Sequence, residues 1–296
     1  MAVTSIPTIT YRVPKRRHPV MAFIVQQPLG ALGLLVIIVM CVAAAFANFV
    51  APYDPLTLDY AQLLAPPSWS HPLGTDSYGR DVFSRIIYGA RTALAVGFLS
   101  SILGSTLGAI IGVASAYFGG RTDLIIQRVM DVLLSFPIIV LALTVVAVLG
   151  KNIILGVDTN LIIAIGVPMV PKVARVVRSS ALAIRELPYI DAARAAGFSH
   201  TRIIFRHIVP NVVAPYLIML TAFVAQAILL EASLSFLGLG VTEPTPAWGL
   251  MLSGAAIDFY QSAPWMIIFP GVAISLAVFA FNLFGDSLRD WLDPKI

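Results

Sequence analysis

The chain contains little charge and a single cysteine. Only 11% of its 296 residues are Asp, Glu, Lys or Arg, whereas about 25% are charged in an average soluble domain. Hydrophobic residues make up 58% of the chain, so the composition indicates an integral membrane protein rather than a water-soluble fold. Because Cys41 is the only cysteine, a disulfide within the chain is excluded.

Motifs for catalytic or nucleotide chemistry are also missing. The nearest approach to a phosphate-binding loop, Gly150-Lys151, has Val145 where that loop needs glycine and Asn152 where it needs Ser or Thr. The sequence Gly238-Leu239-Gly240 follows an apolar helix rather than a strand, and neither a His-Glu-x-x-His site nor a Gly-x-Ser-x-Gly elbow occurs. We therefore expect no bound cofactor, no metal and no enzymatic activity, and an intramembrane enzyme is a weak alternative.

Long apolar runs dominate what is present. Each is close to the roughly 20 residues that a helix needs to cross a bilayer. Together they predict an all-α, single-domain bundle of six transmembrane helices in membrane lipid. The runs cover residues 29–50, 92–118, 124–149, 161–177, 212–236 and 265–284. The third should bend at Pro137, and the fourth must either begin near Ile153 or let its basic residues reach the headgroups.

The predicted segments are a basic, unstructured tail (1–28), a first transmembrane helix (29–50), an external loop (51–90), a core domain of five helices (91–286) and a polar tail (287–296). Ala45-Phe46-Ala47 has the form of a signal-peptidase site. The preceding tail and the apolar run are both long for a signal peptide, so we expect the run to remain as an anchor.

Basic residues are distributed unequally between the two sides of the predicted membrane. With six spans, both termini lie on one side, together with fifteen of the nineteen Lys and Arg residues. The other side has only Arg80, Arg85, Arg91 and Lys151. The positive-inside rule then predicts that both termini and the loop at residues 186–210 are cytoplasmic. Since the basic residues are spread over several loops and are not interleaved with aromatics, we expect no nucleic-acid partner.

The loop at 186–210 has the sequence of two short polar helices. Pro188 suits a first helical position, Asp191 places negative charge in the first turn, and Gly197 suits a stop after an alanine-rich run. A second helical stretch follows, and Pro210 is expected to end it.

The pattern Asp191-Ala192-Ala193, Gly197 and Ile208-Val209-Pro210 resembles the cytoplasmic "EAA" loop of permease subunits of ATP-binding-cassette (ABC) importers. Asp191 stands where that family usually has Glu, and Val209 stands where Leu is commoner. The resemblance implies a coupling helix that fits a groove of an ATPase subunit. Its expected contact residues are Asp191, Ala192, Ala193, Arg194, Gly197 and Phe198.

Two further stretches resemble the second permease of the dipeptide, oligopeptide and nickel branch of this family. They are His71–Thr92 and Glu231–Gly249. The resemblance implies a type I importer permease in the inner membrane, paired with a homologous permease, two ATPase subunits that bind ATP and Mg, and an external substrate-binding protein. A nucleotide-independent secondary transporter or channel remains the alternative.

Five groups of residues carry structural expectations. Gly104, Gly108 and Gly112 recur every four residues and should let another helix approach closely. Glu231 should line the pathway or make a structural hydrogen bond to a neighbouring helix. Asp76 and Asp81 favour turn or capping roles over a metal site. Two shorter expectations complete the set: a short surface helix around Phe83, Ile86 and Ile87, and interfacial aromatics at Trp248, Tyr260 and Trp265.

Overall fold

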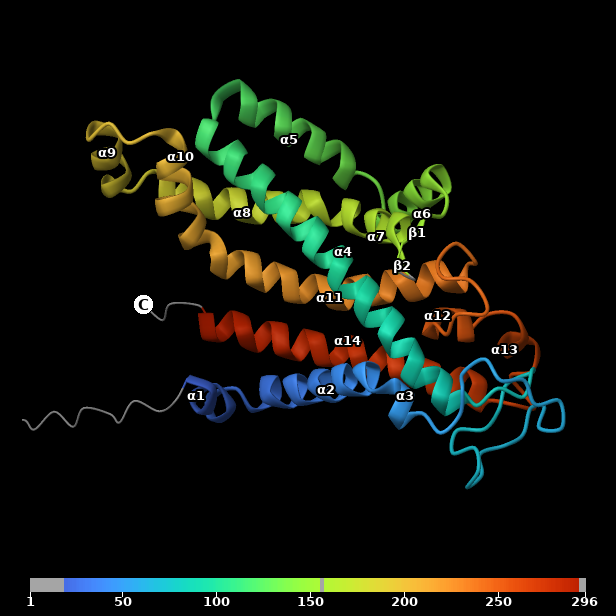
Figure 1. The fold of residues 1–296 in the computed structure, drawn as a ribbon. Coiled ribbons are helices and arrows are strands. Elements are labelled where there is room, and N and C mark those ends of the chain that lie inside the picture. The colour runs from blue at the N-terminus through green and yellow to red at the C-terminus, as the bar shows by residue number, and fades with distance from the viewer. Residues whose placement is uncertain (1–18, 155–156, 293–296) are drawn as a thin grey trace, which may run out of the picture.

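The chain folds into a bundle of long helices. The computed structural model describes residues 19–154 and 157–292, and strands occur in the described part only as the two-residue pair β1 (Ile153–Ile154) and β2 (Val157–Asp158). The helices, shown in Figure 1, are α1 (Pro19–Gln26), α2 (Pro28–Ala45), α3 (Ala47–Val50), α4 (Val82–Phe118), α5 (Gly120–Leu134), α6 (Ile138–Leu149), α7 (Thr159–Gly166), α8 (Val170–Arg185), α9 (Pro188–Ala195), α10 (His200–Ile203), α11 (Val213–Phe236), α12 (Trp248–Met251), α13 (Ala255–Asp258) and α14 (Trp265–Leu292). The all-α prediction is confirmed.

Five helical stretches of the described chain are long and apolar enough to cross a membrane. They are Pro28–Ala45, Val82–Phe118, Thr159–Arg185, His200–Phe236 and Trp265–Leu292. A sixth span requires that α5 and α6 be counted together, although they meet at 94°. The break contains Pro137, which has no amide hydrogen and disfavours helical geometry at the residue before it. The predicted third span therefore corresponds to two helices with a sharp break between them.

The fourth run forms one continuous helical rod. It begins at Thr159, where the Asp158 side chain caps the helix by accepting from the amides of Asn160 and Leu161. A short 3-10 turn at Val167–Met169 joins α7 to α8, because Pro168 and Pro171 occupy first-turn positions where no amide donor is needed. The predicted option of a start near Ile153 is wrong, since Ile153–Ile154 form β1. Lys172, Arg175 and Arg178 lie within α8, and their reach to the headgroups stays a prediction.

Three predicted boundaries are wrong. Phe83, Ile86 and Ile87 lie in the first turns of α4 and not in a separate surface helix, because no breaker interrupts Val82–Phe118. The tail expected to be unstructured includes α1, and residues 1–18 lie outside the described part. At the other end α14 continues to Leu292, which makes most of the expected polar tail helical, and residues 293–296 are again outside the described part.

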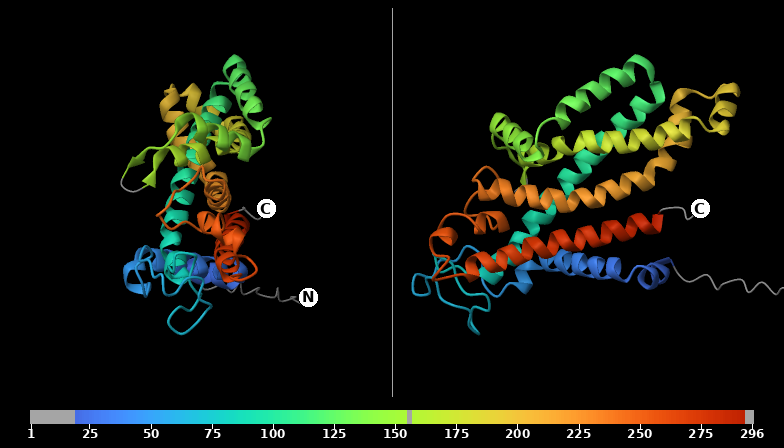
Figure 2. Two further views of the ribbon diagram at one scale, coloured as in Figure 1. Left: turned by 90° about the vertical axis from the view of Figure 1, so that its right-hand side faces the viewer. Right: turned by 180° about the vertical axis from the view of Figure 1, so that it is seen from behind.

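Helix α4 crosses the rest of the bundle obliquely, as the opposite views in Figures 1 and 2 show. Its glycines allow close contact with α7 and α8. A Cβ atom on Gly104 would lie 2.5 Å from the carbonyl oxygen of Gly166, and one on Gly112 would lie 2.5 Å from that of Ala174. The row of glycines predicted to let another helix approach thus packs against the α7–α8 rod of this chain. Helices α2 and α14 form a second packed pair beside it.

Candidate functional site

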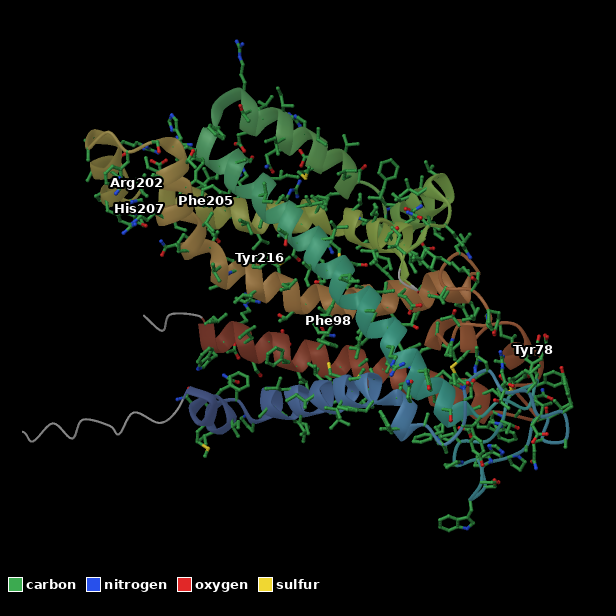
Figure 3. All side chains as sticks on the ribbon, viewed as in Figure 1. Tyr78, Phe98, Arg202, Phe205, His207 and Tyr216 are labelled. Carbon is green, nitrogen blue, oxygen red and sulfur yellow. The ribbon has the colours of Figure 1, made fainter. Side chains whose placement is uncertain are left out.

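Helix α9 projects from one end of the bundle, the end at which α1 begins and α14 finishes (Figures 1 and 3). Leu187 is extended, which turns the chain out of α8, and Pro188 then starts the helix with its preset backbone angle. Gly197 ends the segment at φ +77°, a conformation that favours glycine. Its amide donates to the carbonyl of Arg194, and the amide of Phe198 donates to that of Ala193 at 3.1 Å, so the last carbonyls of the helix are satisfied.

One face of α9 is anchored in the apolar core. Ile190 is fully buried and Ala193 nearly so, within the cluster that also contains Tyr117, Val177 and Ile203. The segment therefore rests on the ends of α4 and α8 and on α10. Because interiors this closely packed transmit displacement, α9 is mechanically attached to these helices.

The opposite face of α9 is open, and most of its side chains are small. Asp191, Ala192 and Arg194 are exposed, together with Ala195, Ala196 and Gly197. Asp191 and Arg194 form an ion pair of 2.9 Å between side chains that are 68% and 40% exposed. A Cβ atom added to Gly197 would meet no heavy atom within 4 Å, so the space beside it is empty within this chain.

The residues expected to contact an ATPase subunit thus fall into two groups. Asp191, Ala192, Arg194 and Gly197 lie on the open face, whereas Ala193 points into the core. Phe198 is half-buried, with its ring stacked on that of His207 and the guanidinium of Arg202 lying 3.9 Å from its centroid. Ala193 and Phe198 therefore position the loop, and the other four residues form its surface.

Pro210 does not end the second helical stretch, contrary to expectation. A π-helical turn at Ile204–Ile208 is followed by a 3-10 turn at Val209–Val212, and the helix continues into α11. In these turns Pro210 stands at a first-turn position where its missing amide leaves no bond unmade. The part of the loop that begins at His200 and α11 are consequently one continuous helical element from His200 to Phe236.

Glu231 lies at the far end of α11 and is buried. Its carboxylate accepts a hydrogen bond of 2.7 Å from Ser235, one turn along the same helix, and Ser235 Oγ accepts in turn from the amide of Val241. The expected bond to a neighbouring helix is therefore wrong, since the partner is intrahelical.

Trp248, expected at the membrane interface, is buried and donates to the carbonyl of Ile86 at 2.9 Å.

A charge network joins two loops near this end of the bundle, and its members are buried except for the exposed Glu243. Arg80 donates to Asp76 at 2.6 Å and to Glu243 at 2.8 Å, and Arg85 is buried beside them. Burial lowers the pKa of Arg80, but its bonds to Glu243 and Asp76 outweigh that effect and leave the pKa raised. Asp81 caps α4 by accepting from the amide of Ser84, which confirms its capping role. The Arg80–Glu243 pairing has no signal in the sequence, because its members are 163 positions apart.

Residues 86–296 match the family model described as the binding-protein-dependent transport system inner membrane component. The chain belongs to this family. Residues 23–67 of the permease match a second model, the N-terminal transmembrane domain of oligopeptide transport permease C. The chain is therefore a permease subunit of an ABC importer, as its loop pattern indicated.

Curated relatives agree with this assignment. The permease is 42% identical to the dipeptide transport system permease protein DppC of Alkalihalophilus pseudofirmus over 92% of this chain and 87% of that protein. It is also 42% identical to the glutathione transport system permease protein GsiD of Pectobacterium atrosepticum over 93% of this chain and 89% of that protein.

A solved structure confirms the fold. The permease resembles a chain of the inward-facing MetNI methionine ABC transporter with a TM-score of 0.55, over 71% of this chain and 97% of that one. At 18% identity, this likeness establishes the type I importer permease fold and nothing about substrate.

Proposed function

We propose that this permease forms half of the translocation pathway for peptides or a related small solute. The names of the relatives, which include dipeptide and glutathione transport, support this substrate class. The other half of the pathway belongs to a homologous permease. Two ATPase subunits bind ATP and Mg and hydrolyse the nucleotide, and an external binding protein delivers the solute. This chain itself hydrolyses nothing, in keeping with the missing phosphate-binding loop.

The coupling element is α9. Its open face has the small residues Ala192 and Gly197, beside the exposed Asp191–Arg194 ion pair, and can enter a groove of an ATPase subunit. Ile190 fixes the other face in the core. This two-faced arrangement is the observation that supports the mechanism. When the ATPase subunits close, α9 moves as a rigid body and displaces α8 and α11, which switches the pathway from inward-open to outward-open.

The permease lies in the inner membrane. The end of the bundle that contains α9 faces the cytoplasm. Both described ends of the chain lie at the α9 end in Figure 1. The loop there contains Arg194, Arg202 and Arg206, and Arg185 directly precedes it. The positive-inside rule supports this orientation, with both termini in the cytoplasm.

Replacing Ala192 with Trp tests the coupling role, because Ala192 is exposed and the new side chain meets open space in this chain. In proteoliposomes that contain the assembled importer and its binding protein, we expect dipeptide uptake to be lost. ATPase activity should no longer respond to the binding protein. Membrane insertion should be unchanged, since no core contact is altered.

Ala183→Trp is the matched control, because Ala183 is exposed on α8 outside the loop. It should transport normally. Normal uptake by Ala192→Trp would refute the coupling role of this face. Nucleotide-independent flux through the purified permease alone would instead support the channel alternative.

A further inference from the structure

An apolar groove opens between α4 and the junction of α10 with α11. Its volume is about 450 Å³. The lining is aliphatic or aromatic apart from Thr106 and Tyr216, whose hydroxyl groups share a hydrogen bond of 3.0 Å and so satisfy each other. Ile110 and Val213 are among the exposed lining side chains, and Phe205 at the end of the groove is 69% exposed. The groove presents a surface for a long apolar group.

A basic hollow adjoins the end of this groove, and Phe205 borders both. Arg202 and Arg206 supply its charge, and Ser199 and Thr201 supply hydroxyl groups. Both arginines are exposed, and no carboxylate of the described residues lies within ion-pair distance of either. The ring of Phe198 holds the Arg202 guanidinium at 3.9 Å. The hollow therefore presents two cations whose charge is not neutralised within the described chain.

The order of these two features matches the polarity of a phospholipid. The groove is lined by parts of the stretches Val82–Phe118 and His200–Phe236, which are long and apolar enough to cross a membrane. Arg202 and Arg206 lie in the first two turns of the second stretch, at the end of a span where headgroups are expected. An acidic protein surface would satisfy the arginines but would leave the apolar groove unexplained. Figure 3 shows Arg202, Phe205 and Tyr216 following one another along this edge of the bundle.

We propose that this composite site binds one anionic phospholipid, with its headgroup phosphate at Arg202 and Arg206 and an acyl chain in the groove beneath Phe205. The site lies on the element that joins the coupling loop to α11, so the lipid would brace that junction. Lipid binding goes beyond the transport function proposed above and needs neither nucleotide nor substrate.

Native mass spectrometry of the assembled importer, titrated with phosphatidylglycerol or phosphatidylcholine, tests the site. Arg202→Gln together with Arg206→Gln should weaken phosphatidylglycerol binding by about thirtyfold, because each basic side chain near an anionic surface contributes about a fivefold factor. Phosphatidylcholine binding should change little. Ile110→Trp, which fills the groove and leaves both arginines in place, should also displace the lipid.

Arg121→Gln is the matched control, since Arg121 is exposed near the same end of the bundle but borders neither cavity. It should bind phosphatidylglycerol like the parent. Equal lipid binding by the double variant and Arg121→Gln would overturn the proposal. Loss of the ATPase subunits from the double variant with lipid binding unchanged would also overturn it and would assign the arginines to a protein partner. Since the assay measures lipid without transport, an importer that fails to couple but retains the lipid refutes only the coupling role.

Discussion

The two ends of the helix bundle are held together by different kinds of contact. At the end away from α9, residues 51–81 have little regular structure, yet a largely buried charge network holds them in place. Arg80 and Asp76, with side chains each 9% exposed, bond to one another, and Arg80 reaches Glu243 in the loop that follows α11. At the α9 end, burial of Ile190 holds the loop, and its ion pair between Asp191 and Arg194 lies on the surface.

The end away from α9 is therefore a rigid frame, and the α9 end is a contact surface. Breaking a buried ion pair leaves an uncompensated charge, so the charges around Arg80 fix one arrangement of the loops. Exposed pairs contribute little to stability, and their charges remain free to meet another molecule. A subunit that must be moved by a partner needs such a surface at one end and a rigid frame at the other.

Asp76→Ala should give the largest loss of stability, because it removes the buried one of the two carboxylates that pair with both Arg80 and Arg85, and leaves only the exposed Glu243. We expect the free energy of unfolding to fall by about 3–5 kcal/mol. Unfolding in mixed detergent micelles measures it. Asp54→Ala, at an exposed position of the same loop, should change it little. Equal stability of the two variants would remove the distinction between the ends.

Asp123→Ala should have an intermediate effect at the α9 end. Asp123 accepts from Arg178 at 2.6 Å, and both side chains are partly buried. Loss of these charged hydrogen bonds should cost about 1.5–3 kcal/mol. Asp131→Ala removes a more exposed partner of Arg175 and should cost less than about 1 kcal/mol in the same assay. An equal cost for both would show that burial does not decide the strength of these pairs.

Gly197→Val should cost about 1–2 kcal/mol, because a side chain is strained at φ +77° although the space around it is open. Under the coupling proposal it should also abolish uptake while insertion is retained. Gly254→Val is matched in its positive φ of +56° and its open surroundings, but it lies at the other end. It should lose similar stability and still transport. Loss of uptake in both variants would attribute the defect to stability alone.

Asp191→Ala should have the smallest effect on stability, below about 1 kcal/mol, because its ion pair with Arg194 is exposed. We expect the substitution to reduce the copurification of ATPase subunits clearly, while the free energy of unfolding changes little. A large fall in stability without a change in copurification would show that Asp191 stabilises the fold and does not contact the ATPase subunits.

Local sequence patterns were sufficient to predict the helical elements and the protein family. Apolar runs longer than any soluble core requires predicted the membrane bundle, and the spacing of Asp191, Gly197 and Pro210 indicated the loop. The repeat of Gly104, Gly108 and Gly112 marked a face for close helix packing. These features depend on residues near one another in the chain, so periodicity and composition reveal them.

Contacts between distant segments could be found only in the tertiary structure. The sequence could not show that Arg80 pairs with Glu243, that Ala193 faces the core while Ala192 faces outward, or that a π-helical turn and then a 3-10 turn carry the chain through Pro210. Each depends on which helices meet and at what angle. That is decided by the packing of the whole bundle, since the same local sequence satisfies several arrangements until its neighbours are in place.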